Sequence, residues 1–557
     1  MTNLVAHDTP LIAADGSRPV RLRDYHAARW VEPLIFGLGT PGERGVRLPL
    51  ADSRAVEALE GSPEAAVRRT DRVALPEVGQ AQVLRHFLRL SQETLGADLN
   101  VDIGQGTCTM KYSPKVNEEF AGSTQSVDTH PLQHPSTVQG TLEIIQELER
   151  YISAVSGMDA VSLQAGAGSA AIWGNVQIVR AYHAHRGEAG TRDEVVTTIF
   201  SHPSNAAAAK TAGYRVITLY PGEDGLIDPE TVRAAVSART AALMITNPED
   251  TGIFNPRIAE IVAAAHEVGA LCVYDQANAN GVLGITRARE AGFDLCHFNL
   301  HKTFSTPHAC GGPAAGAIGA TAELEPFLPG PRIVRDDDGL LSQEDRGPLS
   351  TAPLRPFWGV TPNLIRAYAW IRALGAEGLR EAAEVAVINN NYVMTRLCAI
   401  DGVRPAYLEG RLPPIEQVRY SWADLALDTG ISSGELGQRL ADFGMHLWTS
   451  HHPYVVPDPA TIEPTESYSR RELDEYVDAL HAVAAEARKD PDLIREAPHR
   501  SSIHHLDAES MTDPETWATS WRAYRRKYLG DASEVPPHWS PSAGTPIRER
   551  AEKLFHR

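Results

Sequence analysis

The sequence predicts an α/β protein whose main sheet is mostly parallel and covered by helices on both faces. Between about residues 137 and 300, short apolar runs alternate with longer stretches of helical periodicity. The apolar runs are nearly continuous, which is typical of strands buried on both faces. Strands that alternate with helices at this spacing indicate crossover connections and therefore parallel pairing.

The elements of this region can be placed in chain order. A helix is expected over 138–156, then a short strand over 160–163, the turn 166–169 and a helix that reaches Tyr182. Further strands are expected over 194–199, 214–220, 241–246 and 270–274, separated by helices from Ser204, over 229–237 and over 256–268.

The flanking regions have a different character. Residues 1–120 are expected to form an N-terminal arm followed by a helical segment that includes 83–95, and residues 121–345 the large domain. Residues 346–500 are expected to form a smaller α+β domain, and 501–557 a C-terminal tail. Long helical stretches in the smaller domain are predicted over 364–397, with a break at 375–378, and over 432–443 and 469–489.

Composition restricts the class of protein. The apolar fraction of 43% and the charged fraction of 22% are those of a soluble globular protein. A net charge of −19 argues against non-specific binding to nucleic acid or anionic membranes. The N-terminus lacks a signal-peptide core, and no apolar run is long enough to span a membrane. The five cysteines are scattered and lack metal-ligand spacing, so we expect reduced thiols, a cytoplasmic protein and no metal site.

The stretch 294–308 places a lysine at the mouth of a buried strand. An apolar run leads into Lys302, and a loop of small residues, 309–313, follows. Burying an ammonium group is costly unless it is paired or neutralised. An imine with pyridoxal phosphate (PLP) removes that cost, and such lysines work with an acid opposite the pyridine nitrogen. Asp275, which ends the preceding strand, supplies the acid, so the pattern predicts a PLP site.

Polar residues at the ends of the other strands complete this site, because ligands of such sheets bind beyond the carboxyl ends of the strands. The turn 166–169 precedes a helix, so its amides can hold a phosphate. Lys302, Asp275 and His202, which can stack on a flat ring, are the predicted catalytic residues. The predicted cofactor-binding residues are Lys302, Asp275, His202, Gly168, Ser169, Ala167, Thr246, Asn247, Asn278, His301 and Thr303.

Each of these residues also has an ordinary structural explanation. A lone lysine is normally on the surface, a lone loop histidine is normally solvated or a cap, and an isolated aspartate often caps a helix. Their coincidence at strand ends favours the cofactor site. The residues expected around the substrate are Thr107, Cys108, Lys111, Ala170, Ile172, Gln276, His308 and Cys310.

Several long motifs point to one family. They include Cys108-Thr109-Met110-Lys111-Tyr112, Gly157-Met158-Asp159-Ala160-Val161-Ser162-Leu163-Gln164, Asn299-Leu300-His301-Lys302-Thr303-Phe304 and Ile462-Glu463-Pro464-Thr465-Glu466-Ser467. From about residue 33 to residue 506 the chain resembles the PLP-binding half of glycine decarboxylase, subunit 2 of two-subunit glycine dehydrogenase (decarboxylating). This resemblance implies the fold type I architecture of PLP enzymes, a dimeric active site, Lys302 as the imine lysine, Asp275 at the pyridine nitrogen and His202 stacked on the ring.

Some positions depart from the family pattern. Ala170, Ala171 and Ile172 stand where the family has polar residues, glycine and an acid, and Ala309-Cys310-Gly311-Gly312 replaces four glycines. We interpret these changes as a remodelled substrate pocket. They predict a biosynthetic PLP enzyme that activates Cα of a larger amino acid, such as S-adenosylmethionine, for elimination, replacement or carbon–carbon bond formation.

The alternative is glycine decarboxylase activity, which implies a lipoyl carrier protein and a first subunit as partners. A PLP-free structural partner is disfavoured because Lys302 and Asp275 are both present, and an aminotransferase stays open. In every enzymatic case we expect a small amino-acid substrate and a homodimer.

Overall fold

A computed structural model describes most of the chain. The described residues are 11–12, 19–20, 22, 32–46, 49–60, 62–63, 65, 75–93, 98–108, 111–308, 314–407, 413–449 and 455–499. The contacts divide them into two compact units: one holds residues 11–22 and 98–495, and the other holds residues 32–93 and 496–499. The predicted C-terminal tail, most of the N-terminal arm and Cys310 lie outside the described residues.

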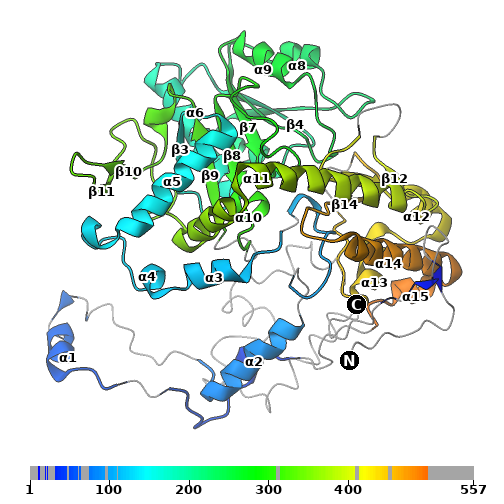
Figure 1. Ribbon diagram of the computed structural model, residues 1–557, viewed down its shortest axis with the longest axis horizontal. Helices are drawn as coiled ribbons and strands as arrows, with labels where there is room; N and C mark the ends of the chain where they lie inside the picture. The colour runs from blue at the N-terminus through cyan, green and yellow to red at the C-terminus, as the bar shows by residue number, and fades with distance from the viewer. Residues whose placement is uncertain are drawn as a thin grey trace. The chain divides into compact units, whose positions relative to one another are not determined.

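The first unit is built around a seven-stranded sheet, as the alternation of apolar and helical stretches predicts (Figure 1). Its strands are β3 (Ala160–Ser162), β4 (Glu194–Thr198), β5 (Arg215–Leu219), β6 (Thr240–Thr246), β7 (Leu271–Gln276), β8 (Leu295–Asn299) and β9 (Gly316–Ala320). The order is β3-β9-β8-β7-β6-β4-β5; β9 pairs antiparallel with both β3 and β8, and the other pairs of neighbours are parallel. The predicted fold class is confirmed.

Helices cover both faces of this sheet. They are α5 (Gln139–Ser156), α6 (Gly168–His185), α7 (Pro203–Thr211), α8 (Pro229–Ala235), α9 (Ile258–His266) and the short α10 (Leu300–Thr303). Alternate residues of β6 enter different cores: Leu243 and Ile245 pack with α5 and α9, whereas Ala242 and Met244 pack with α6. Both faces of the strand are therefore buried, which explains the continuous apolar run in the sequence.

Helix α11 (Thr361–Leu397) connects two hydrophobic cores. Gly375 has non-helical angles (φ 65°, ψ −176°) and kinks the helix where the sequence predicts a break. Leu364 and Trp370, before the kink, pack in the core on the α5 face of the sheet, and Val393 and Leu397, near the end, pack in a separate core.

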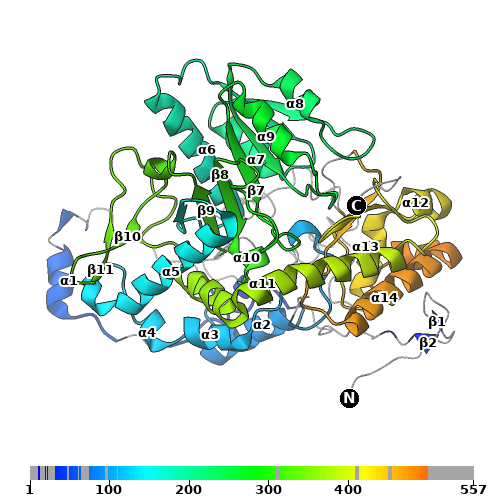
Figure 2. The same ribbon diagram turned by 45° about the horizontal axis from the view of Figure 1, so that its top comes forward.

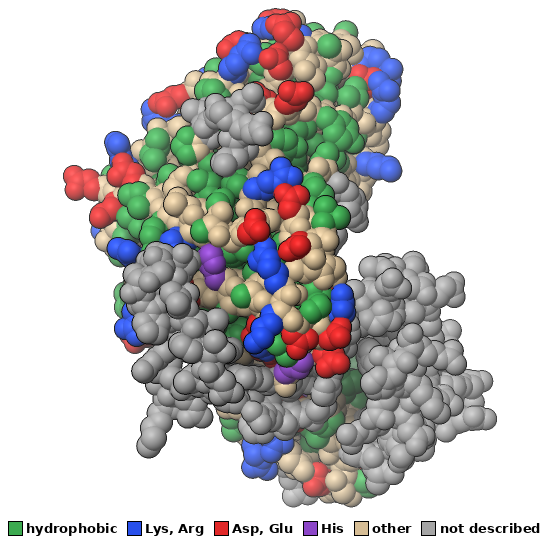
Figure 3. All heavy atoms as spheres, turned by 90° about the vertical axis from the view of Figure 1, so that its right-hand side faces the viewer, with side chains coloured by type: hydrophobic (Ala, Val, Ile, Leu, Met, Phe, Trp, Pro, Cys, Tyr) green, Lys and Arg blue, Asp and Glu red, His purple; other side chains and the backbone are tan. Residues whose placement is uncertain are grey.

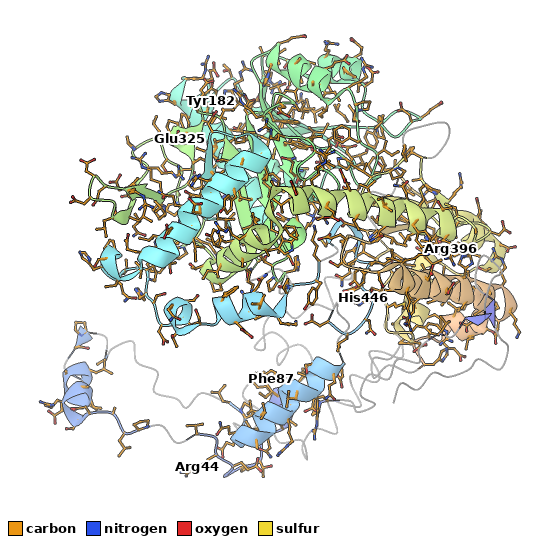
Figure 4. The ribbon with its side chains drawn as sticks, in the orientation of Figure 1. Arg44, Phe87, Tyr182, Glu325, Arg396 and His446 are labelled. Atoms are coloured by element: carbon orange, nitrogen blue, oxygen red, sulfur yellow. The ribbon has the colours of Figure 1, made fainter. Side chains whose placement is uncertain are left out.

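The separate core is built on a three-stranded antiparallel sheet and four helices. These elements are β12 (Arg404–Pro405), β13 (Val418–Ser421), β14 (Pro459–Ile462), α12 (Ala423–Thr429), α13 (Ser433–Ala441), α14 (Arg470–Lys489) and α15 (Pro491–Arg495). Arg396 ties α11 to α14 through Asp474 at 2.5 Å and Asp478 at 3.3 Å (Figure 4).

Smaller elements complete the first unit. They are the strand pairs β1 (Leu11–Ile12) with β2 (Pro19–Val20) and β10 (Arg332–Arg335) with β11 (Leu341–Glu344), the helices α3 (Lys115–Ala121) and α4 (Thr124–Val127), and the 3-10 turns η3 (Gly106–Cys108), η4 (Pro135–Thr137) and η6 (Glu325–Phe327).

The second unit contains a turn and two helices, η1 (Ile35–Gly37), α1 (Ser53–Glu60) and α2 (Gln80–Gln92). Within it, His86 Nδ1 on α2 lies 2.8 Å from Glu32 Oε1. Helix α2 begins three residues before the predicted start, because Gln82 caps the backbone amide of Gly79.

Charges of both signs are interspersed on the surface. On the face in Figure 3, Lys and Arg side chains lie between Asp and Glu side chains and apolar patches. No helix in the described part of the chain is both long and apolar enough to cross a lipid bilayer.

Candidate cofactor site at the ends of the parallel strands

Lys302 lies where β8 passes directly into α10. The side chain is buried, and the residue is only 4% exposed. Figures 1 and 2 show α10 at the end of the central sheet, next to α11. Lys302 forms no direct ion pair with any residue that the structure describes, and burying an amine without one is costly.

Asp275 lies on the adjacent strand and is also buried. The sheet register pairs it with Thr246 on β6 and with His297 on β8. Its Oδ2 accepts a hydrogen bond from Asn205 Nδ2 at 2.8 Å and its Oδ1 from the Ala277 amide at 3.0 Å, and His297 Nε2 lies 3.2 Å from Oδ1.

These neighbours keep the Asp275 carboxylate ionised. Burial alone would raise its pKa, but His297, His202 and the two hydrogen bonds outweigh burial and hold the pKa below its usual range. Burial lowers the pKa of His297, which favours the neutral ring. Asp275 therefore carries a buried negative charge and forms no direct ion pair with a lysine or arginine among the described residues.

The turn before α6 provides an open helix N-terminus. Ala167 is the N-cap and forms no side-chain cap, so the first amides of the helix lack a side-chain acceptor. A Cβ on Gly168 would lie 2.5 Å from the Asn299 side chain, and a Cβ on Gly166 would lie 2.5 Å from Arg355 Nε. A side chain at Gly168 would displace the buried Asn299, whereas one at Gly166 would need only the flexible end of Arg355 to move. Ser169 is exposed on the first turn.

His202 caps the next helix after β4. Its Nδ1 accepts from the Ser204 amide at 3.2 Å, and the ring is exposed. His202 is thus a helix cap, which is the ordinary structural role considered for it. Its ring is also close enough to Asp275 to lower the pKa of that carboxyl group. At the end of β6, Thr246 Oγ1 lies 3.2 Å from Ser201 Oγ, whereas the Asn247 side chain is used within its own loop, by the backbone of Asn255.

The loop after β7 contacts Glu463, the residue directly after β14. Thr303 Oγ1 accepts from the Ala279 amide at 2.9 Å. Asn278 and Asn280 each donate from Nδ2 to Glu463 Oε1 at 2.6 Å. His301 Nδ1 pairs with the Ala315 carbonyl at 2.9 Å, and burial lowers the pKa of His301 to about 3.

The residues expected around the substrate are only partly brought together. Lys111 is buried, lies 3.0 Å from Glu466 Oε1 and sits 4.9 Å from the Trp370 ring centroid. Gln276 is buried beside Asp275, and His308 stacks edge-on against His301 at 4.9 Å.

The other residues of that group differ in position. Cys108 is half-buried in η3, which contacts β14, and Ala170 is half-buried in α6. Ile172 packs in the core between α6 and the sheet. The Thr107 side chain and all of Cys310 lie outside the described residues.

Backbone strain is found near the site. Ser305, Phe357 and Thr465 have φ of 59°, 58° and 56°, a region that costs a non-glycine residue free energy. Ser305 lies just after α10, the Phe357 carbonyl accepts a hydrogen bond from Gln164, two residues beyond β3, and Thr465 lies two residues after Glu463. Strained residues of this kind cluster at functional sites.

Sequence reasoning missed several residues that define the site. Asn205 and His297 fix Asp275, Arg355 lies over Gly166, and Glu463 holds the loop after β7. For His297 the sequence did offer a signal, because this histidine stands inside the apolar run of a buried strand, two residues after its start. Glu463 stands in a motif that carries the family resemblance but comes from a distant part of the sequence.

A separate cavity lies away from these residues. It has a volume of about 700 Å³ and is lined by α3, α5 and α11, including Phe120, Thr141 and Tyr368. None of the predicted site residues lines it. The chemistry is therefore assigned to the strand ends and not to this cavity.

The residues at the strand ends fit PLP. Asn205 Oδ1, Gln276 Oε1 and Asn299 Oδ1 are buried and have no hydrogen-bond partner among the residues described. Buried polar atoms without partners are uncommon and indicate a missing ligand or water. An unpaired buried amine, an ionised carboxylate and an open helix N-terminus suit the aldehyde, the pyridine nitrogen and the phosphate of this cofactor.

Comparisons with known proteins agree with this chemistry. The model of the aminotransferase class-V family matches residues 174–397, and that of the glycine dehydrogenase C-terminal domain matches residues 382–499. Relatives from Pyrococcus horikoshii and Pyrococcus abyssi are 38% and 40% identical over 512 residues, 92% of this chain and 99% of theirs. A relative from Halalkalibacterium halodurans is 39% identical over 481 residues, 86% of this chain and 96% of its own. All three are named probable glycine dehydrogenase (decarboxylating) subunit 2.

Solved structures share the fold. A glycine decarboxylase (P-protein) of the glycine cleavage system, in inhibitor-bound form, matches with a TM-score of 0.64 at 20% identity, over 77% of this chain and 94% of that one. A sphingosine-1-phosphate lyase from Burkholderia pseudomallei matches with a TM-score of 0.56 at 17% identity, over 77% and 96%.

These findings confirm some predictions and correct one. The family, an enzyme and PLP as its cofactor are confirmed. The prediction of a biosynthetic enzyme for a larger amino acid is wrong, because relatives that cover nearly the whole chain carry the glycine dehydrogenase name. That prediction depended partly on Ile172. The structure shows Ile172 packed in the core beneath α6, so the apolar residue at this position serves core packing and does not shape a new pocket.

Proposed function

Because the chain belongs to the family of glycine dehydrogenase (decarboxylating) subunit 2, we propose that it releases the carboxyl group of glycine as carbon dioxide with PLP. The observation that supports this most is the pair formed by Lys302, buried without an ion-pair partner in the described chain, and the ionised Asp275 on the neighbouring strand. PLP, when bound, supplies an electron sink for the bond that breaks at Cα.

The residues then have distinct proposed roles. Asp275 stabilises a positive charge on the pyridine nitrogen, and Asn205 and His297 keep Asp275 ionised and in place. Lys302 would hold the cofactor, and its amine would be positioned to donate or accept a proton at the substrate. The N-terminus of α6 at Gly168 and Ser169 holds the phosphate, and His202 lies against the ring while it caps α7.

The proposed partners are a first subunit and a lipoyl carrier protein. The name subunit 2, carried by the relatives, supports the first, and the family resemblance supports the second. The α3–α4 face, defined here by Val116, Phe120, Val127 and Leu132, offers an apolar surface for a protein partner, because these side chains are 50–69% exposed. Association of the chain with a second copy of itself stays a prediction.

Exchange of labelled bicarbonate into the carboxyl group of glycine tests this function. We expect exchange when the PLP-loaded chain is mixed with the first subunit and a lipoyl carrier protein, and none when Lys302→Ala replaces the chain. The Lys302→Ala variant should also lose the visible absorbance of lysine-bound PLP. Absence of exchange in the complete mixture, with the chain loaded with PLP, would reject glycine decarboxylation.

A further inference from the structure

Glu463 places a fully buried carboxyl group beside the candidate site. It follows β14 directly and is 0% exposed. Its Oε1 accepts hydrogen bonds from Asn278 and Asn280, each at 2.6 Å, which fixes the loop that follows Asp275. Its Oε2 is buried and has no hydrogen-bond partner in the described part of the chain. An unpaired carboxyl oxygen is expensive to bury, so this oxygen requires a proton or a cationic neighbour.

The charged groups around Glu463 come from three other segments. Lys302 on α10 and Lys111 before α3 both act on it electrostatically, and Glu416 before β13 is a buried acid close to it. Glu466 forms an ion pair with Lys111, with 3.0 Å between Glu466 Oε1 and Lys111 Nζ. Glu416 packs against Gly281, where a Cβ would lie 2.4 Å from Glu416 Oε2.

The balance of these groups brings Glu463 close to titration at neutral pH. Burial raises its pKa, while the two asparagine amides, Lys302 and Lys111 lower it, and the result is about 7. For Glu416, burial and the nearby Glu463 raise the pKa well above its usual range, so Glu416 stays neutral. Of these two buried acids, Glu463 is therefore the one that changes charge under physiological conditions.

We propose that Glu463 is a positioning residue that sets the charge of the Lys302 nitrogen, with Oε1 fixing the loop after Asp275 and Oε2 left for the proton. An ionised Glu463 stabilises a positive charge on the lysine nitrogen, and a protonated Glu463 does not. When Glu463 loses its proton to solvent, it becomes negatively charged. This charge makes the proton on the lysine nitrogen harder to remove. The inference rests on the proposed role of Lys302 as the residue that holds PLP.

A pH titration of the visible absorbance of the PLP-loaded chain tests this inference, because the spectrum of lysine-bound PLP changes when the lysine nitrogen loses its proton. We expect Glu463→Gln to lower the midpoint of that titration by about one pH unit. Glu416→Gln is the matched control, since it removes an equally buried acid that stays neutral, and it should leave the midpoint close to wild type. The same midpoint in Glu463→Gln and wild type, or an equal shift in Glu416→Gln, would overturn the proposal.

A second variant keeps the test decisive if Glu463→Gln does not fold or load PLP. Asn280→Leu removes one donor to Oε1, which raises the pKa of Glu463 and so lowers the midpoint by a smaller amount. No shift in Asn280→Leu would then overturn the proposal. The titration needs neither glycine nor a partner subunit, so a shifted midpoint together with absent bicarbonate exchange would reject the proposed function and leave the role of Glu463 standing.

Discussion

At the scale of single residues, neighbours decide what each ionisable group can do. Asp275 is buried but stays ionised because Asn205, the Ala277 amide and His297 surround it. Glu249, equally buried, has no such set of donors: burial raises its pKa to about 8, and only the Thr198 hydroxyl opposes this effect. Two buried acids in one domain are thus expected to differ in charge at neutral pH.

Asp275→Asn tests the role of the buried negative charge. The amide keeps the shape of the side chain but cannot stabilise a positive pyridine nitrogen, so we expect glycine–bicarbonate exchange to fall by at least about 100-fold. Asp294→Asn is the control, because Asp294 precedes β8 at the opposite end of the sheet, beside His266. Exchange within a few-fold of wild type in Asp275→Asn would remove Asp275 from the proposed machinery.

Glu249→Gln tests the neutral acid through the pH dependence of stability. A carboxyl whose pKa is raised on folding contributes stability that is complete below its unfolded value and is lost as the pH rises through about 8. The glutamine side chain carries no charge at any pH. The free energy of unfolding of the variant, relative to that of wild type, should therefore increase by as much as about 4 kcal/mol between about pH 5 and pH 8. Melting temperatures across this range measure the effect, with the exposed Glu223→Gln as the control, and parallel curves for Glu249→Gln and wild type would contradict it.

At the scale of elements, the kink in α11 allows one helix to serve two cores. The part before Gly375 packs with α3 and α5, and the part after it packs with α14. Without a change of direction, the helix could not present Trp370 to one core and Leu397 to the other. The glycine is therefore required by its backbone angles and not by a close contact, since a Cβ there would meet nothing within 4 Å.

Gly375→Ala isolates the cost of these angles. We expect a loss of about 1–3 kcal/mol, because an alanine is strained at φ 65° and ψ −176° even in open space. Gly140→Ala in the first turn of α5 is the matched control, since it is also open but helical, and it should be neutral or slightly stabilising. Thermal unfolding of both variants measures the difference, and an equally stable Gly375→Ala would show that the kink relaxes without cost.

The elements show which kinds of sequence signal are reliable. Strands β4 to β7 were predictable because Val, Ile, Leu and Met form continuous runs, and the break in α11 because glycines interrupt a helical pattern. Strand β9 was not predicted, since Gly316-Ala317-Ile318-Gly319-Ala320 consists mostly of small residues without strand preference. Its small residues are a packing requirement: a Cβ on Gly319 would lie 2.8 Å from Cys296 Sγ.

At the scale of the whole molecule, the candidate site depends on contacts that local sequence does not contain. The positions of Lys302, Asp275 and His202 at the carboxyl ends of strands were predictable from the apolar runs that precede them, and their roles stay a prediction. The pairing of Asn278 with Glu463 spans 185 residues and joins the loop after β7 to a different sheet. Periodicity and turn signals act over a few residues, so they could not place Glu463 at the loop after β7 or Glu416 near Glu463.

Assembly with a partner is the last property that belongs to the whole molecule. The α3–α4 face is apolar and exposed, and Phe120 on this face lines the 700 Å³ cavity. The ring of His130, just after α4, lies 5.7 Å from Phe357, which neighbours the Gly166 turn, so the face reaches the edge of the candidate site. A partner bound there would cover the cavity and lie next to the turn at Gly166.

Phe120→Asp tests whether this face receives the first subunit. A charge in place of a large apolar side chain should weaken association at least about tenfold, because aromatic side chains at the centre of an interface carry much of its binding energy. Sedimentation velocity of the chain mixed with the first subunit measures this, with Glu119→Gln on the exposed side of α3 as the control. Since Phe120 lies outside the strand-end site, the absorbance of the PLP-loaded variant should be unchanged. Wild-type association of Phe120→Asp with the first subunit would place the interface elsewhere, and lost PLP absorbance would show damage to the fold.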